Sequence, residues 1–266
     1  LPQGSSVVSL QGRSSPEKQF RVENPTPYPD LPLVIVLNGQ SASAAEMIAA
    51  AFQDHDRAWL VGEPSFGKGV AEAVLPLSGG NALVLTTALY FTPRGRSLQK
   101  PLPETALAGI LDQGPREFYT DNGRPIREQG GVEPDEIAEP WKLDQWTELL
   151  QQTTAFINFA QDFVNRRGAV LSDFQADDAV VDEFKRYLGQ AGVRPPETDW
   201  QRALPFLRMR IQAEMLNLVF GIAKGDEAEA RADPQLRAAV AAMARAERLV
   251  GTAEAATKTR SDAGQR

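Results

Sequence analysis

The sequence contains no cysteine and only one histidine, His55. Without cysteine there can be no disulfide, no thiolate metal site and no cysteine nucleophile. A single histidine also excludes a zinc site built from three histidines. Hydrolytic chemistry in this chain would therefore have to use Ser, Thr, Lys, Asp or Glu, and we expect neither a metal nor another cofactor.

Long apolar runs are absent as well, since no window approaches the roughly 18 uninterrupted apolar residues of a membrane span. The formal net charge of −7 argues against a general nucleic-acid binder. Hydrophobic residues make up 42% and charged residues 24%, which is typical of a folded globular chain. The chain starts at Leu1 with neither methionine nor a signal-like segment, and we interpret it as part of a longer precursor.

The first 139 residues alternate short apolar runs with Gly and Pro, which favours a sheet-rich module. The runs at 33–37 and 58–62 are typical of strands buried on both faces, and an alanine-rich helical segment lies between them. This order predicts two strands joined by a crossover helix. Further strands are expected at 7–10, 20–22, 70–77 and 82–91, with a hairpin turn at 78–81. We therefore predict an α/β fold with a mixed β-sheet and crossover helices.

Residues 140–251 place apolar side chains at helical spacing, which predicts an all-α region whose stripes pack against each other. Asp233-Pro234 is a suitable cap and first turn for the last helix. Residues 252–266 are small and polar, and we expect a disordered tail there. The apolar positions at helical spacing within residues 140–251 form four groups: Leu149, Leu150, Ile157, Ala160 and Phe163; Val180, Phe184, Tyr187 and Leu188; Leu204, Leu207, Ile211, Met215 and Leu218; and Leu236, Val240, Met243 and Val250.

The segment GEPSFGKG at 62–69 has most of a phosphate-binding loop, because Gly62, Gly67 and Lys68 hold the G-x-x-x-x-G-K spacing. However, Gly69 replaces the hydroxyl residue that binds magnesium. The residues that follow favour a strand, whereas a phosphate loop must open a helix. The sequence therefore argues against nucleotide binding here.

A Ser-His-Asp hydrolase is the second possibility, because GQSAS at 39–43 lies between a strand and a helix, as a nucleophile elbow does. The one available base, His55, falls at the far end of the same helix. Twelve residues separate it from Ser43, which is about 18 Å and too far for proton transfer. The spacing excludes this triad and leaves His55 as a solvated residue at the helix end.

A serine nucleophile with a lysine base is the third possibility. Ser43 would lie at the positive end of the helix, where the Ala44 amide could face an oxyanion. Lys68, between two glycines and directly after a buried strand, is the candidate base, since burial among apolar groups disfavours the charged form of a lysine. A structural interpretation stays open, because Ser43-Ala44-Ala45-Glu46 also fits a capping box.

Four motifs occur in order: NGQSASAAEM with QDHDRA, VGEPSFGKG, TTALYFTPRGRSLQ, and GGVEPD at 130–135. Together they resemble the C-terminal processing peptidases, also called tail-specific proteases, over about residues 30–135. The resemblance implies a crotonase-like protease core within 1–139 and a serine endopeptidase that cuts proteins recognised through their C-terminal tails. It also implies a periplasmic or otherwise exported location.

Carried over to this sequence, the nucleophile falls on Ser43, not Ser41, and the general base on Lys68. Family members commonly place a Gln four residues after the lysine, and here that position is Glu72, whose negative charge favours the charged lysine and opposes its use as a base. Asp54 falls on a position sometimes implicated in family activity.

The family pattern also implies parts that would precede this chain: a PDZ domain that binds the substrate tail and a strand that supplies the other oxyanion amide. A non-catalytic peptide-binding scaffold with the peptidase fold is therefore the alternative function. Relatives use helical C-terminal parts for assembly, so a homo-oligomer through residues 140–251 is a further prediction.

Overall fold

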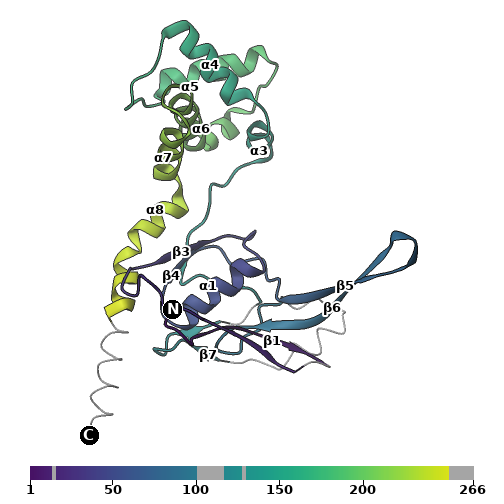
Figure 1. Cartoon of the computed structure of the whole chain (residues 1–266). Coiled ribbons are helices and arrows are strands. Elements are labelled where there is room, and N and C mark those ends of the chain that lie inside the picture. Colours follow the sequence, from purple (N-terminus) through teal and green to yellow (C-terminus); the bar gives the residue numbers. More distant parts are fainter. Residues whose placement is uncertain (14–15, 101–116, 128–129, 252–266) are drawn as a thin grey trace. The chain divides into compact units, whose positions relative to one another are not determined.

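The computed structural model (Figure 1) describes residues 1–13, 16–100, 117–127 and 130–251, so the predicted tail at 252–266 lies outside the described residues. The chain forms two compact units. Among the described residues, the first comprises Leu1–Ala138 and residues 238–251, and the second comprises Glu139–Arg237. The predicted division differs from this one at residues 238–251, which it placed with the helical region 140–251 and which here group with the first unit.

The predicted strand, helix and strand are confirmed in the first unit. Strand β3 (Val34–Leu37) and strand β4 (Trp59–Gly62) pair in parallel, and helix α1 (Ala44–Asp54) connects them. Strand β9 (Glu136–Ile137) extends this sheet, also in parallel, to give the order β3-β4-β9. One expectation was wrong: β3 is not buried on both faces, because Val36 is 36% exposed.

A second sheet is antiparallel, with the order β2-β1-β6-β5. Its members are β1 (Ser6–Gly12), β2 (Lys18–Arg21), β5 (Val70–Pro76) and β6 (Ala82–Phe91). The predicted hairpin joins β5 to β6 through a short 3-10 turn, Ser78–Gly80. A small third sheet pairs β7 (Phe118–Tyr119) with β8 (Pro125–Ile126).

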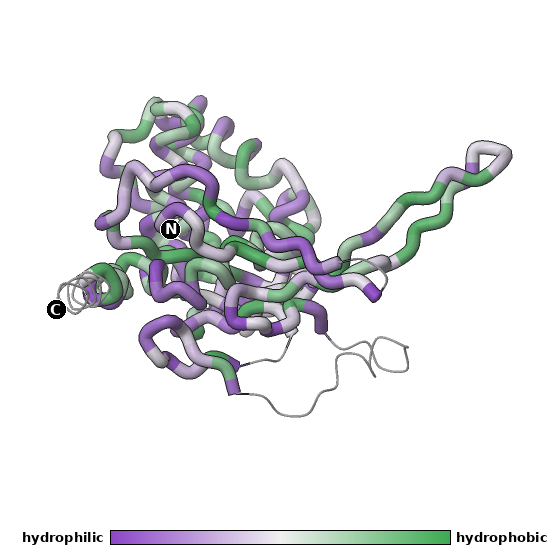
Figure 2. Tube along the Cα trace, turned by 60° about the horizontal axis from the view of Figure 1, so that its bottom comes forward, coloured by the Kyte–Doolittle hydropathy of each residue, from purple (hydrophilic) through white to green (hydrophobic). Residues whose placement is uncertain are grey.

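The far part of the β5–β6 hairpin extends beyond the rest of its sheet as a two-stranded ribbon (Figures 1 and 2). Apolar side chains lie exposed along it, and Figure 2 shows their hydrophobic colour on both strands. They are Val74, Leu75, Leu77, Leu83, Val84 and Leu85. β5 ends the strand order of its sheet, so its outer edge has no partner strand among the described residues.

The core of the first unit lies between α1 and the parallel sheet. Small side chains let the helix approach the strands closely, because alanine has no side chain beyond Cβ. The buried apolar residues of this cluster are Leu37, Ala49, Ala50, Ala58, Leu60, Leu98 and Val132. The tight contact of β3 with β4 requires Gly62 (φ +128°), where a Cβ would lie 2.0 Å from the Leu37 carbonyl oxygen.

The second unit is helical, as predicted. Its helices are α3 (Gln145–Gln151), α4 (Ala155–Arg167), α5 (Asp178–Gln190), α6 (Glu197–Phe220) and α7 (Ile222–Ala232). Stacked and tilted aromatic rings centre on Phe184, which contacts Phe156, Phe159 and Trp200. The predicted stripes are confirmed only in part, since Leu149 and Ile157 are more than half exposed.

Helix α8 (Pro234–Ala241) begins as predicted, with Asp233 Oδ1 accepting the Leu236 N–H at 2.8 Å, and residues 243–251 are helical as well. The buried side of this segment is not the predicted Leu236 and Val240, which are 40% and 73% exposed. The buried side consists of Ala239, Ala242, Ala246 and Leu249. No helix within the described ranges is long and apolar enough to cross a bilayer.

Candidate functional site

Ser43 lies in the turn between β3 and α1 with φ 58° and ψ −116°. Among the described residues other than glycine, only Asp56 shares a positive φ. A serine in this region carries backbone strain of the order of 1–3 kcal/mol, and such strain persists where the surroundings enforce it. A strained serine between a strand and a helix is the geometry of a nucleophile elbow. The adjacent Ala44 N–H is a first-turn amide of α1, which has no acceptor within the helix.

Lys68 lies in a tight loop between β4 and β5. A Cβ on Gly67 (φ +89°) would lie 2.6 Å from Lys100 Cγ, and one on Gly69 would lie 2.5 Å from the Gln99 backbone nitrogen. The close approach of residues 98–100 therefore explains both glycines. A strand follows this loop, as expected from the sequence, so the loop does not open a helix as a phosphate loop would.

Glu46 joins these two segments. It is fully buried, and its Oε2 accepts the backbone N–H groups of Ser43 and Lys68, each at 2.8 Å. Because both nitrogens lie within hydrogen-bond distance of one oxygen, they are no more than about 6 Å apart. The structure thus brings together the backbones of the two predicted catalytic residues.

The second oxygen of Glu46 holds the same loop. Oε1 accepts the Ser65 hydroxyl at 2.5 Å and the Gly67 N–H at 2.7 Å. Ser65 Oγ in turn accepts the Val132 N–H at 2.7 Å, and a Cβ on Gly131 (φ +76°) would lie 2.7 Å from that oxygen. The GGVEPD segment therefore lies against the buried carboxylate. The lack of room for a Cβ explains why its second residue, Gly131, is a glycine.

Sequence reasoning treated Glu46 only as a capping residue and did not single out Ser65. The capping bond from the Ser43 N–H does form, but it accounts for one of four hydrogen bonds to this carboxylate. The sequence signal for a buried Glu46 was its place on the same side of the helix as Ala49 and Ala50, which are buried.

Lys68 Nζ lies 3.3 Å from Glu72 Oε2, at the start of β5. The two side chains are 45% and 41% exposed. The expectation that Lys68 is buried among apolar groups was therefore wrong, because nearly half of its side chain is exposed. The position of Glu72 beside the amine agrees with the sequence analysis.

Asp54 and His55 lie at the opposite end of α1, about 16 Å from Ser43 at helical rise. Asp54 is fully buried and pairs with the buried Arg96 at 2.5 Å, and it also accepts the Arg94 N–H at 2.9 Å. It contacts neither Ser43 nor Lys68, so its interactions are those of a structural residue.

His55 is more constrained than expected. Its ring bridges Asp121 and the Ser6 carbonyl oxygen, each at 2.8 Å, and its side chain is only 18% exposed. The sequence analysis described a solvated residue, and that description was wrong. The exclusion of His55 as a base for Ser43 agrees with its place at the far end of the helix.

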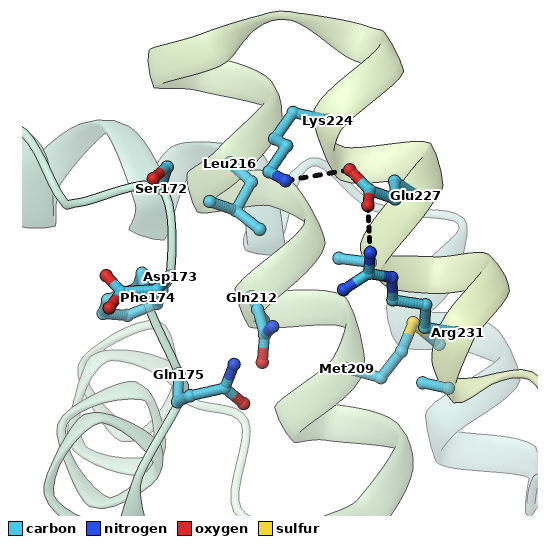
Figure 3. A pocket seen from close by; sticks show the side chains of 12 residues that line it. Ser172, Asp173, Phe174, Gln175, Met209, Gln212, Leu216, Lys224, Glu227 and Arg231 are labelled. Carbon is cyan, nitrogen blue, oxygen red and sulfur yellow. Dashed lines mark hydrogen bonds and ion pairs between the residues drawn. The ribbon is translucent and has the colours of Figure 1, made fainter.

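The helical unit contains a pocket of about 530 Å³ between α6, α7 and the segment 172–175 (Figure 3). Glu227 lies between Lys224 and Arg231 and pairs with both; the hydrogen bond from Lys224 and then the charge of Arg231 lower the pKa of Glu227. None of the predicted catalytic residues lines this pocket.

Within the described part of the chain, no three His, Asp or Glu side chains are grouped to hold a metal ion.

Comparison with known proteins finds a family match within the first unit. Residues 1–110 match peptidase family S41, a range that contains Ser43, Glu46 and Lys68. The chain is 41% identical over 110 residues to the carboxy-terminal-processing protease of Bartonella bacilliformis, covering 37% of this chain and 25% of that protein.

Two further relatives of the chain carry similar names. The carboxyl-terminal-processing protease of Synechocystis sp. is 39% identical over 100 residues, covering 38% of this chain and 23% of the relative. Chloroplastic carboxyl-terminal-processing peptidase 1 of Arabidopsis thaliana is 36% identical over 93 residues, covering 35% and 19%. The matched part thus spans about a quarter or less of these relatives' length.

Among solved structures, the photosystem II D1 C-terminal processing protease aligns with 52% of this chain and 28% of its own, at 25% identity and a TM-score of 0.37. The similarity to family S41 rests on the sequence matches.

Proposed function

We propose that the full-length protein containing this chain is a serine endopeptidase that cleaves proteins recognised through their C-terminal tails. Ser43 is the nucleophile, Lys68 the general base, and the first unit the crotonase-like core of this peptidase class. The observation that carries the proposal is the convergence of the Ser43 and Lys68 backbone N–H groups on Glu46 Oε2. The strained backbone of Ser43 supports it independently.

In the proposed reaction, Ser43 Oγ attacks the scissile carbonyl carbon while neutral Lys68 takes the hydroxyl proton. The oxyanion that forms accepts a hydrogen bond from the Ala44 N–H. When the C–N bond breaks, Lys68 returns the proton to the leaving amine. Water then hydrolyses the acyl-enzyme, with Lys68 again as base, and Glu72 positions the amine throughout.

The outer edge of β5 is the place we propose for the substrate main chain. This strand starts two residues after Lys68 and carries Glu72, so a peptide strand added there would pass beside the proposed base. Names of relatives place some of them in chloroplasts, and for this protein we propose an exported location.

The test is peptidase activity of the full-length protein on casein. We expect Ser43→Ala and Lys68→Ala each to lower kcat by about 10³-fold or more, because a nucleophile and its base act as a unit. Ser41→Ala is the matched control, since the Ser41 hydroxyl bonds within the turn to Asn38, and it should keep most of its activity. Near-normal activity of either Ser43→Ala or Lys68→Ala would overturn the mechanism.

The exposure of Lys68 and its pairing with Glu72 favour a second candidate function, a non-catalytic scaffold that binds peptide tails. A lysine that contacts a carboxylate with both side chains exposed is also the ordinary geometry of a surface ion pair. Such a scaffold would bind tail peptides with no turnover by the full-length protein, and Ser43→Ala would leave that binding unchanged.

Glu72→Gln separates the two functions. Glutamine keeps an oxygen that can accept from the Lys68 amine and removes the negative charge beside it. For the peptidase we expect Glu72→Gln to hydrolyse casein with a kcat at least equal to that of the unmodified protein, whereas a scaffold shows no turnover with either residue. Glu63→Gln, in the preceding loop, is the control and should leave kcat unchanged. A loss of kcat in Glu72→Gln alone would contradict the view that an acceptor oxygen at position 72 is enough to position the amine.

A further inference from the structure

The backbone on both sides of Lys68 is held by acceptors and donors from three other segments. The N–H groups of Gly67 and Lys68 are bound by Glu46, as described above. The carbonyl oxygen of Gly67 accepts the Lys100 N–H at 3.0 Å, and that of Gly69 accepts the Tyr90 N–H at 2.8 Å. The third backbone donor of residues 67–69 is the Gly69 N–H, which donates to Gln99 Oε1 at 3.0 Å.

Gln99 is suited to this task by its own surroundings. Its side chain is only 8% exposed, and its Nε2 donates to the Lys100 carbonyl oxygen at 2.9 Å. A carbonyl oxygen can only accept, so this bond orients the amide with Oε1 toward Gly69. The backbone nitrogen of Gln99 donates to Ser97 Oγ at 3.2 Å, which holds the start of the side chain.

We infer that Gln99 is a positioning residue for the general base: its Oε1 binds the Gly69 N–H and, together with Glu46, fixes the backbone from which Lys68 extends. This inference rests on the proposed function of Lys68. Without the bond, the Gly69 N–H is a buried donor with no acceptor, and the loop must shift to reach one. A shift of about 1 Å in a catalytic group can cost roughly 10²-fold in rate.

Three substitutions in the full-length protein test the inference. Gln99→Met keeps the length of the side chain but removes the acceptor, and we expect kcat to fall by about 10- to 100-fold while KM changes little. Gln99→Glu keeps an oxygen for Gly69 and should retain more activity than Gln99→Met. Gln53→Met is the matched control: Gln53 is 3% exposed and also donates to a backbone carbonyl, that of Glu133, but it lies at the far end of α1.

Amide hydrogen exchange supplies a readout that does not depend on activity. In Gln99→Met the amides of residues 67–69 should exchange faster than in the unmodified protein, whereas Gln53→Met should leave them unchanged. Unchanged exchange at Gly69, or a kcat for Gln99→Met equal to that of Gln53→Met, would overturn the inference. If Lys68→Ala is fully active, the proposed function fails on its own, and the exchange measurement still tests the contact of Gln99 with Gly69.

Discussion

At the scale of single residues, Glu46 has the greatest influence on the candidate site. A carboxylate offers about four acceptor positions, and here four donors from residues 43, 65, 67 and 68 use them. Burying such a group is costly unless it is fully hydrogen-bonded. Because every acceptor position has a donor, the carboxylate can be buried. It also holds the turn at Ser43 next to the loop 65–68.

Glu46→Gln should weaken this arrangement, because one acceptor oxygen becomes an NH2 donor that faces two other donors. We expect the free energy of unfolding to fall by about 1–3 kcal/mol and kcat to fall with it. Urea denaturation and casein hydrolysis measure the two effects. Glu63→Gln, a partly exposed glutamate in the neighbouring loop, is the control, and equal stability of the two variants would contradict this role for Glu46.

At the scale of elements, the geometry of the site depends on how closely β3 and β4 approach. Ser43 follows β3 and Lys68 follows β4, so the pairing of these parallel strands places both loops at one end of the sheet. Gly62, the last residue of β4, makes that pairing possible, since its Cα faces the Leu37 backbone. The element boundaries that the sequence predicts are close to those observed because both strands are apolar and both are bounded by turn residues.

Gly62→Ala should therefore destabilise the first unit. The added methyl group would lie 2.0 Å from the Leu37 carbonyl oxygen, and φ of +128° is unfavourable for alanine. We expect a loss of about 2–4 kcal/mol in the free energy of unfolding, measured by denaturant titration. Gly39→Ala has open space around its Cβ and should be nearly neutral; a similar loss in both variants would argue against the steric cause.

At the scale of the whole molecule, the chain combines a segment that matches a peptidase family with a helical unit that has its own core. The S41 match ends at residue 110, and the aromatic cluster of the second unit is built from residues of that unit. Phe220 and Ile222 lie exposed on this unit, and assembly through the helices stays a prediction.

The helical unit should fold by itself because its core is self-contained. A fragment of residues 139–237 is expected to show a cooperative thermal transition by circular dichroism. Phe184→Ala in that fragment should lower its stability by about 3–5 kcal/mol, since Phe184 is fully buried among aromatic rings. A fragment without a cooperative transition would show that the unit depends on the rest of the chain.

The sequence by itself determined the strands and the helix within residues 7–91, the exclusion of cysteine and histidine chemistry, and the candidates Ser43, Lys68 and Glu72, whereas it did not predict β7, β8 or β9. These follow from local patterns: apolar runs between turn residues, residue types that are absent, and motifs in a fixed order. The tertiary structure decided what depends on contacts between distant segments: the convergence of Ser43 and Lys68 on Glu46, the contact of Gln99 with Gly69, the exposure of Lys68 and the pairing of Asp54 with Arg96. A spacing pattern reports which face of one element is apolar, whereas a buried hydrogen bond depends on which element lies opposite.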